Sequence, residues 1–181
     1  AGQIREPATV LHGEANLRLV DAGALLEAPF GNGRGSALIA GRYGYPGPVL
    51  SAVVDDLKIG YWDYQARASW QLSDRDTISV FAFGSHDYLA QGVPSGDPTA
   101  SKEPVEQLVS DFHRVDLRYD RALTDGRVRL ALTGGYDSRG AAPNHMTDRS
   151  LGARLEVERG LTEALRFRGG ADIRLDHYRL E

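Results

Sequence analysis

The sequence contains no cysteine and only one methionine among its 181 residues. The lack of cysteine excludes disulfide scaffolds, thiolate zinc sites and cysteine nucleophiles. No stretch approaches the roughly 18 uninterrupted apolar residues of a membrane-spanning helix. The net charge of -4 does not indicate an extended surface for nucleic acid. With 41% hydrophobic residues, the sequence has the average composition of an ordinary globular protein.

The strongest pattern is an alternation of apolar and polar residues. In segment 61–72, Trp62 and Trp70 fall on one side of the alternation, and Asp63 and Arg67 fall on the other. Because successive side chains of a β-strand point to opposite faces, this pattern predicts a strand with one apolar and one polar face. The same pattern predicts strands over 127–137, 150–161 and 165–177, and less cleanly over 34–45, 76–86 and 112–123.

The run 12–30 breaks its alternation near Asp21-Ala-Gly23. It is either one bent strand or two short strands that meet at a tight turn, and Gly23 could supply the unusual backbone angles for either. The sequence therefore predicts an all-β antiparallel meander of eight or nine long strands.

The expected connections alternate in length. Turn-forming residues predict tight turns at 31–33, 73–76, 124–126 and 161–163, whereas long loops are expected at roughly 46–60, 87–111 and 139–148. Short turns on one side and long loops on the other are typical of an outer-membrane β-barrel. The residues of a soluble lipocalin-like barrel also alternate between apolar and polar, but its loops need not differ in length between the two ends.

Strand length and composition favour the membrane barrel. The expected strands exceed the about 5–6 residues of a typical globular strand and match tilted membrane strands. Their apolar faces carry many Ala and Gly, as a lipid-facing surface can. Aromatic residues are expected near the strand ends, which is typical of interfacial girdles. They are Tyr43, Tyr45, Tyr61, Trp62 and Tyr136 beside the long loops, and Phe30 and Trp70 beside the short turns.

Residues 12–30 carry a family resemblance. Gly13-Glu-Ala-Asn-Leu17, then Asp21-Ala-Gly-Ala-Leu-Leu-Glu-Ala-Pro-Phe30 and a Gly-rich turn, resemble the junction between plug and barrel in TonB-dependent outer-membrane receptors, although Ala28 replaces the usual Gly. Tyr61-Trp-Asp-Tyr-Gln-Ala-Arg67 and Phe112-His-Arg-Val-Asp-Leu-Arg-Tyr-Asp120 are similar to later barrel strands. The resemblance spans about 12–180.

The resemblance implies a parent barrel of 22 strands with an N-terminal plug. Residues 1–11 are then the tail of the plug or its linker, and 12–181 form the N-terminal portion of the barrel. Because the alternation continues to Tyr178-Arg-Leu-Glu181, we expect a fragment. The implied location is the outer membrane of a Gram-negative bacterium. The implied partners are lipid, the plug and remaining strands, the TonB energy-transducing system and a small solute.

Few residues suggest chemistry. His86, Asp87 and His145 lie in or near expected outer loops and are weak candidates for ligand binding. The histidines lack metal-ligand spacing, and the adjacent Asp55 and Asp56 are weak evidence for a cation site. Ser85, His86 and Asp87 alternate faces on one strand, so a catalytic triad is not expected. The sequence predicts no catalytic residue, metal or cofactor.

Two main functions follow. The first is part of a TonB-dependent receptor that takes up a scarce solute through its long loops and plug. The alternative is a complete small eight-stranded outer-membrane barrel with a structural or adhesive role. An outer-membrane enzyme would need a convergent catalytic set that the sequence does not offer.

Overall fold

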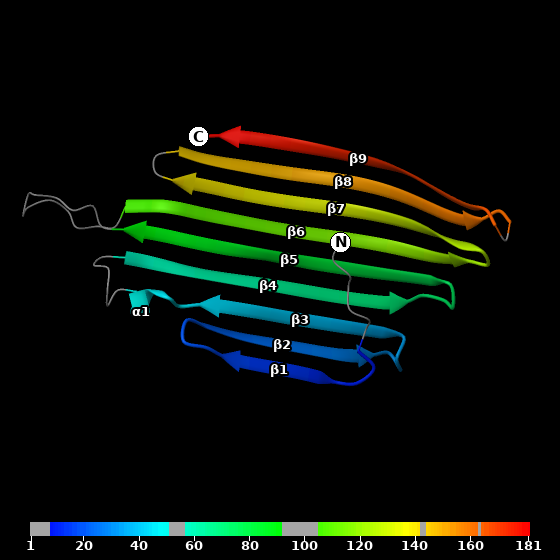
Figure 1. The fold of residues 1–181 in the computed structure, drawn as a ribbon, viewed down its shortest axis with the longest axis horizontal. Helices are drawn as coiled ribbons and strands as arrows, with labels where there is room; N and C mark the ends of the chain where they lie inside the picture. The colour runs from blue at the N-terminus through cyan, green and yellow to red at the C-terminus, as the bar shows by residue number, and fades with distance from the viewer. Residues whose placement is uncertain (1–7, 51–56, 92–104, 142–143, 163) are drawn as a thin grey trace, which may run out of the picture.

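The computed structural model describes residues 8–50, 57–91, 105–141, 144–162 and 164–181, and it forms one nine-stranded antiparallel sheet. The strands follow one another in sequence order, as Figure 1 shows. They are β1 (His12–Leu17), β2 (Asp21–Phe30), β3 (Gly35–Gly44), β4 (Leu57–Gln71), β5 (Asp76–Gln91), β6 (Val105–Leu123), β7 (Gly126–Ala141), β8 (Asn144–Gly160) and β9 (Arg166–Leu180). A single turn of helix, α1 (Gly47–Leu50), lies between β3 and β4. The predicted all-β meander is confirmed, with nine strands.

Residues 12–30 form two strands joined by a tight turn. The backbone N–H of Arg18 donates to the carbonyl oxygen of Asp21 at 2.8 Å and closes the turn between β1 and β2. The role expected for Gly23 is wrong. Gly23 lies within β2 opposite Asn16, and the positive φ angles in the described residues occur only in the next turn. The break in alternation therefore marks the start of β2, directly after the turn that joins it to β1.

The turn between β2 and β3 requires glycine. Gly31, Asn32 and Gly33 have φ angles of 58°, 58° and 84°, in the left-handed region that glycine and asparagine tolerate. A Cβ atom on Gly31 would lie 2.3 Å from the ring of Trp70, which stacks on Phe30 with ring centroids 5.3 Å apart. The predicted turn and the aromatic pair beside it are thus one packed unit.

The connections differ between the two ends of the sheet. At one end, β2–β3, β4–β5, β6–β7 and β8–β9 are joined by tight turns. At the other end, the left side of Figure 1, longer stretches of sequence, 45–56 and 92–104, separate β3 from β4 and β5 from β6. We call this the long-connection end.

Three expected loop boundaries are wrong. β4 begins at Leu57, β5 continues to Gln91, and β6 begins at Val105, so strands occupy the last residues of the expected loop 46–60 and both ends of the expected loop 87–111. The Gly and Pro residues of the latter segment all lie within 92–104, and the flanks carry no residue that would end a ladder. The expected long loop at 139–148 is also absent, because only residues 142–143 separate β7 from β8.

The sheet has two chemically different faces. On the polar face, the strand register aligns charged residues such as Glu27, Arg67 and Asp116. On the apolar face, it aligns residues such as Ile39, Ala66 and Val115. The alternation that the sequence displays is therefore the alternation of the two faces.

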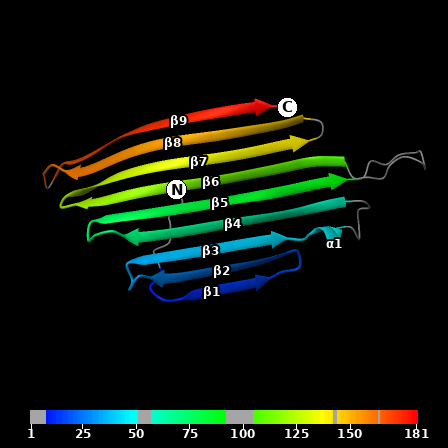
Figure 2. The same ribbon diagram turned by 180° about the vertical axis from the view of Figure 1, so that it is seen from behind.

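The sheet is a single layer without a hydrophobic core. Figure 2, the reverse view, shows no described element packed across the strands. Among the described residues, the buried hydrophobic side chains are limited to Leu38, Ala90 and Ala131. Large apolar side chains on the apolar face are instead exposed, and Leu151 and Leu175 each retain 68% of their accessible surface. An apolar surface of this kind marks an interaction site. No helix in the described ranges is long and apolar enough to span a membrane.

Candidate functional site

Three phenylalanines interrupt the polar face near the centre of the sheet. Phe81 and Phe83 of β5 share the phase of Ser85, and Phe112 of β6 lies opposite Ser85. The rings of Phe81 and Phe83 stack with centroids 5.2 Å apart, and Phe112 meets Phe83 edge-on at 5.9 Å. Around Phe81 and Phe83, β5 is therefore apolar on both faces, which explains the unclear alternation in 76–86.

A cavity lies beside this phenylalanine cluster. Its volume is about 510 Å³, within the range of about 300–1,000 Å³ that small-molecule sites occupy. The strands β2 and β3 present small or slender side chains there, including Gly23, Leu25 and Ala40. The cavity exists because these side chains of β2 and β3 are small, and the rings of β5 and β6 form its apolar side.

Arg42 and Asp63 form a polar wall of the cavity. Nη2 of Arg42 lies 2.6 Å from Oδ2 of Asp63, and its Nε donates to the same oxygen at 2.7 Å. Arg42 also covers the ring of Tyr61, with 5.3 Å between the guanidinium carbon and the ring centroid. Both partners of the ion pair remain partly exposed. The site thus offers a guanidinium, a carboxylate and aromatic surface to one bound solute.

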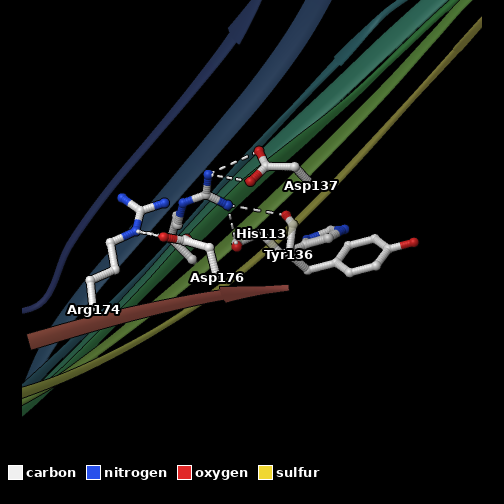
Figure 3. Close-up of polar contacts among 6 residues, drawn as sticks. His113, Tyr136, Asp137, Arg174 and Asp176 are labelled. Atoms are coloured by element: carbon white, nitrogen blue, oxygen red, sulfur yellow. Dashed lines mark hydrogen bonds and ion pairs between the residues drawn. The ribbon is translucent and has the colours of Figure 1, made fainter. Parts of the chain in front are cut away.

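Arg114 holds the opposite side of the cluster in place. Its guanidinium donates to both carboxylate oxygens of Asp137, at 2.9 and 2.6 Å, and to the carbonyl oxygens of His113 and Tyr136. Figure 3 labels these three partners and marks the contacts with dashed lines. It also lies 5.8 Å from the ring centroid of Phe112. Nη2 reaches the carboxylate and Nη1 reaches the two carbonyls, so the guanidinium is held in place against the aromatic ring.

The rest of the polar face, over β6 to β9, is a ladder of opposite charges. Glu158 alone is approached by three arginines, and Arg174 and Asp176 of β9 pair within one strand, as Figure 3 also shows. The other cross-strand pairs include Arg129 with Asp120 and Arg154 with Asp172. Opposite charges across strands stabilise the pairing of a sheet. Because the signs are mixed, the ladder selects no solute charge.

The most buried ion pair joins β2 to β4. Nη2 of Arg67 lies 2.6 Å from Oε1 of Glu27, and the exposed fractions of the two side chains are 9% and 0%. The same oxygen accepts a hydrogen bond from the backbone N–H of Ala8 at 3.2 Å. Ala8, which lies shortly before β1, is therefore attached to the polar face.

The structure does not bring together the three residues suggested by the sequence. Asp87 lies inside β5 and His145 lies inside β8, so their expected position in loops is wrong, whereas His86 lies in β5 as the alternation over 76–86 predicts. His86 contacts Asp111 on the apolar face, with 2.6 Å between Nδ1 and Oδ1. Asp87 lies on the polar face, where it accepts from Ser85 at 3.3 Å. Whether they bind a ligand stays a prediction, and the weak cation candidates Asp55 and Asp56 fall outside the described residues.

Aromatic and imidazole rings form a band on the apolar face near its long-connection end. Trp62 stacks with Tyr64 and His86, at centroid distances of 6.1 and 5.9 Å. His113 stacks with Tyr136 at 6.2 Å and contacts the hydroxyl of Tyr64 through Nδ1 at 3.2 Å. Tyr61, expected among the girdle aromatics, instead lies on the polar face, where its hydroxyl donates to Asp21.

Sequence reasoning missed the phenylalanine cluster and the Glu27–Arg67 pair. Phe81 and Phe83 share the parity of Ser79 and Ser85, so a strict count of parity could have placed them on the polar face. The partnership of Glu27 with Arg67 has no comparable signal, since strand β3 and a long connection separate the two residues in the sequence.

Comparisons with known proteins assign no family. No protein-family model matches the chain, and searches of curated proteins and of solved structures return no significant match. Within the described ranges, no group of three or more histidine or acidic side chains is placed to hold a metal ion.

Proposed function

We propose that this chain is part of the barrel wall of a TonB-dependent outer-membrane receptor that takes up a scarce solute. The observation that carries the proposal is the single-layer sheet, with an exposed apolar face opposite an ion-paired polar face. Lipid would cover the first face, and the second would line a watery lumen. The aromatic rings near both ends of the apolar face fit the two membrane interfaces.

The position of the chain before β1 supports this orientation. The N–H of Ala8 contacts Glu27 on the polar face. A plug that fills the lumen has to reach the first strand from the lumen side, so its linker would follow the same side. The open cavity beside Phe83 then faces the lumen and would contact the solute or the plug.

The strand count weighs against the alternative of a complete eight-stranded barrel. In a meander of nine antiparallel strands, the edge strands β1 and β9 run in the same direction. They cannot close the sheet by the antiparallel pairing that such barrels use. Since unpaired strand edges are not tolerated in lipid, further strands would complete the wall.

Membrane insertion is tested first. We expect the 181-residue chain alone to aggregate or stay unfolded in detergent, and the full-length protein that carries it to migrate on gels in a heat-modifiable way. A 181-residue chain that is monomeric and folded without detergent would overturn the membrane assignment. One that refolds alone as a single heat-modifiable unit would favour the small barrel.

Transport is tested separately. Cells that express the full-length protein should accumulate its solute only when the TonB system is intact, and the protein should be found in the outer-membrane fraction. Uptake that is unchanged after loss of TonB would overturn the receptor assignment and leave the membrane barrel standing.

A further inference from the structure

The apolar face carries a row of histidine, tyrosine and arginine side chains near its long-connection end. His113, Tyr136, Arg149 and His177 are successive partners across β6, β7, β8 and β9. Arg149 and His177 lie directly opposite each other and are exposed. In the described part of the chain, neither has a carboxylate partner. This contrasts with the polar face, where most of the arginines are paired.

The rows next to it on the same face are apolar and exposed. Leu151 and Leu175, two residues further from the long-connection end, lie opposite each other, and each is 68% exposed. Leu132 and Ile173 follow, with exposed fractions of 58% and 65%. This row, with the charge of Arg149, therefore borders an apolar surface that is open for several residues along β7, β8 and β9.

We propose that this part of the apolar face binds a phosphorylated membrane lipid. The guanidinium of Arg149, the imidazole of His177 and the hydroxyl of Tyr136 would donate to the phosphate, while the acyl chains would cover Leu151, Leu175 and Ile173. Arginine suits this role because its planar fork pairs with phosphate at two points. The inference rests on the proposed membrane location.

Charge complementarity identifies the occupant. A free phosphate ion would leave the leucines exposed to water, and a neutral lipid would leave Arg149 unpaired in a medium of low polarity. A phosphorylated lipid would both pair with Arg149 and cover the exposed leucines. The chain as a whole carries a net charge of -4 and would repel an anionic lipid, so any preference has to arise locally.

The test uses the full-length protein in neutral detergent micelles. Native mass spectrometry would compare the retention of phosphatidic acid with that of phosphatidylcholine of identical acyl chains, so that only the headgroup differs. We expect phosphatidic acid to be retained preferentially, and millimolar inorganic phosphate not to displace it. Displacement by phosphate, or equal retention of the two lipids, would overturn the proposal.

Matched variants locate the site. Arg149→Gln combined with His177→Gln should weaken phosphatidic acid binding about tenfold or more, because bonds to charged groups are lost. Arg149→Lys should retain only part of the binding, because the positive charge remains while the two-point contact with phosphate is lost. Arg139→Gln is the control, since Arg139 is exposed near the same end of the sheet but lies on the polar face. An equal effect of Arg139→Gln would overturn the assignment to this row.

The two proposals fail in different ways. If the full-length protein does not enter micelles or membranes, both the membrane location and the lipid site are wrong. If it enters them and shows no headgroup preference, the lipid site alone is wrong.

Discussion

Arg67 of β4 and Glu27 of β2 meet on the polar face across Leu38 of β3, although no backbone ladder joins their strands. Removing one partner of a buried pair leaves a charge without compensation. We expect Glu27→Gln or Arg67→Met to lower the free energy of unfolding of the full-length protein by about 3 kcal/mol. Urea unfolding in micelles, followed by tryptophan fluorescence, measures this loss.

The exposed pair Arg42–Asp63 provides the control for that prediction. Arg42→Met should cost no more than about 1 kcal/mol, because solvent screens an exposed pair. The double variant Glu27→Leu with Arg67→Met should recover part of the loss, since it leaves no buried charge. Equal costs for the buried and the exposed pair would contradict the assigned burial.

Gly31 and Gly33 offer a comparison within one turn. Both have positive φ, so alanine at either position costs roughly 1 kcal/mol of backbone strain. Alanine at Gly31 would in addition clash with Trp70, whereas nothing lies within 4 Å of a Cβ atom at Gly33. We therefore expect Gly31→Ala to destabilise the protein more and to shift the tryptophan emission spectrum. If Gly33→Ala produces the same shift, the packing of Trp70 against this turn is wrong.

The assignment of faces is tested with neighbouring residues. The 181-residue segment contains no cysteine, so single spin labels can be attached at Leu132→Cys and Thr133→Cys without background from it. Both positions are exposed, and they point to opposite faces. In membranes, we expect dissolved oxygen to relax the label at 132 and a water-soluble nickel chelate to relax the label at 133. Equal access of the chelate to both labels would exclude a lipid-covered apolar face.

The phenylalanine cluster is tested through solute uptake. Phe83 contacts both Phe81 and Phe112, so Phe83→Ala removes the centre of the cluster. If the cavity contacts the solute, the apparent affinity of Phe83→Ala for the solute in uptake should fall about tenfold, as expected when an aromatic anchor is truncated. Ser79→Ala, on the same strand and face, should leave uptake unchanged. A normal affinity in Phe83→Ala would exclude the cluster from solute binding.

Local alternation was sufficient to predict most of the sheet. Each strand with clear alternation was found, and the turn at Gly31 followed from its composition. Strand ends were less predictable, because residues such as Tyr88, Leu89 and Leu108 contain no breaker and simply continue the ladder beyond the expected loop. The length of the β7–β8 connection was misjudged for the same reason, since Pro143 is the one strong breaker in that region.

The candidate site was much less predictable than the fold. His86, Asp87 and His145 were selected by residue type and by an expected position in or near loops. Strand parity places Asp87 on the opposite face from the two histidines, and β6 and β7 lie between His86 and His145. The cavity depends on the juxtaposition of small residues on β2 and β3 with rings on β5 and β6. Such contacts between distant segments are set by register, which a single sequence specifies only through the faces it buries.

The length of β6, Val105–Leu123, has a consequence for recognition. At about 3.3 Å per residue this strand extends roughly 60 Å, or about 45 Å along the membrane normal at a tilt of roughly 40°. The apolar band of an outer-membrane barrel is only about 25 Å tall. In the proposed receptor, the ends of β5 and β6 would therefore extend beyond the lipid as a pair of hydrogen-bonded strands. A solute arriving from outside would first meet a preformed surface, and little conformational entropy would be lost when it binds.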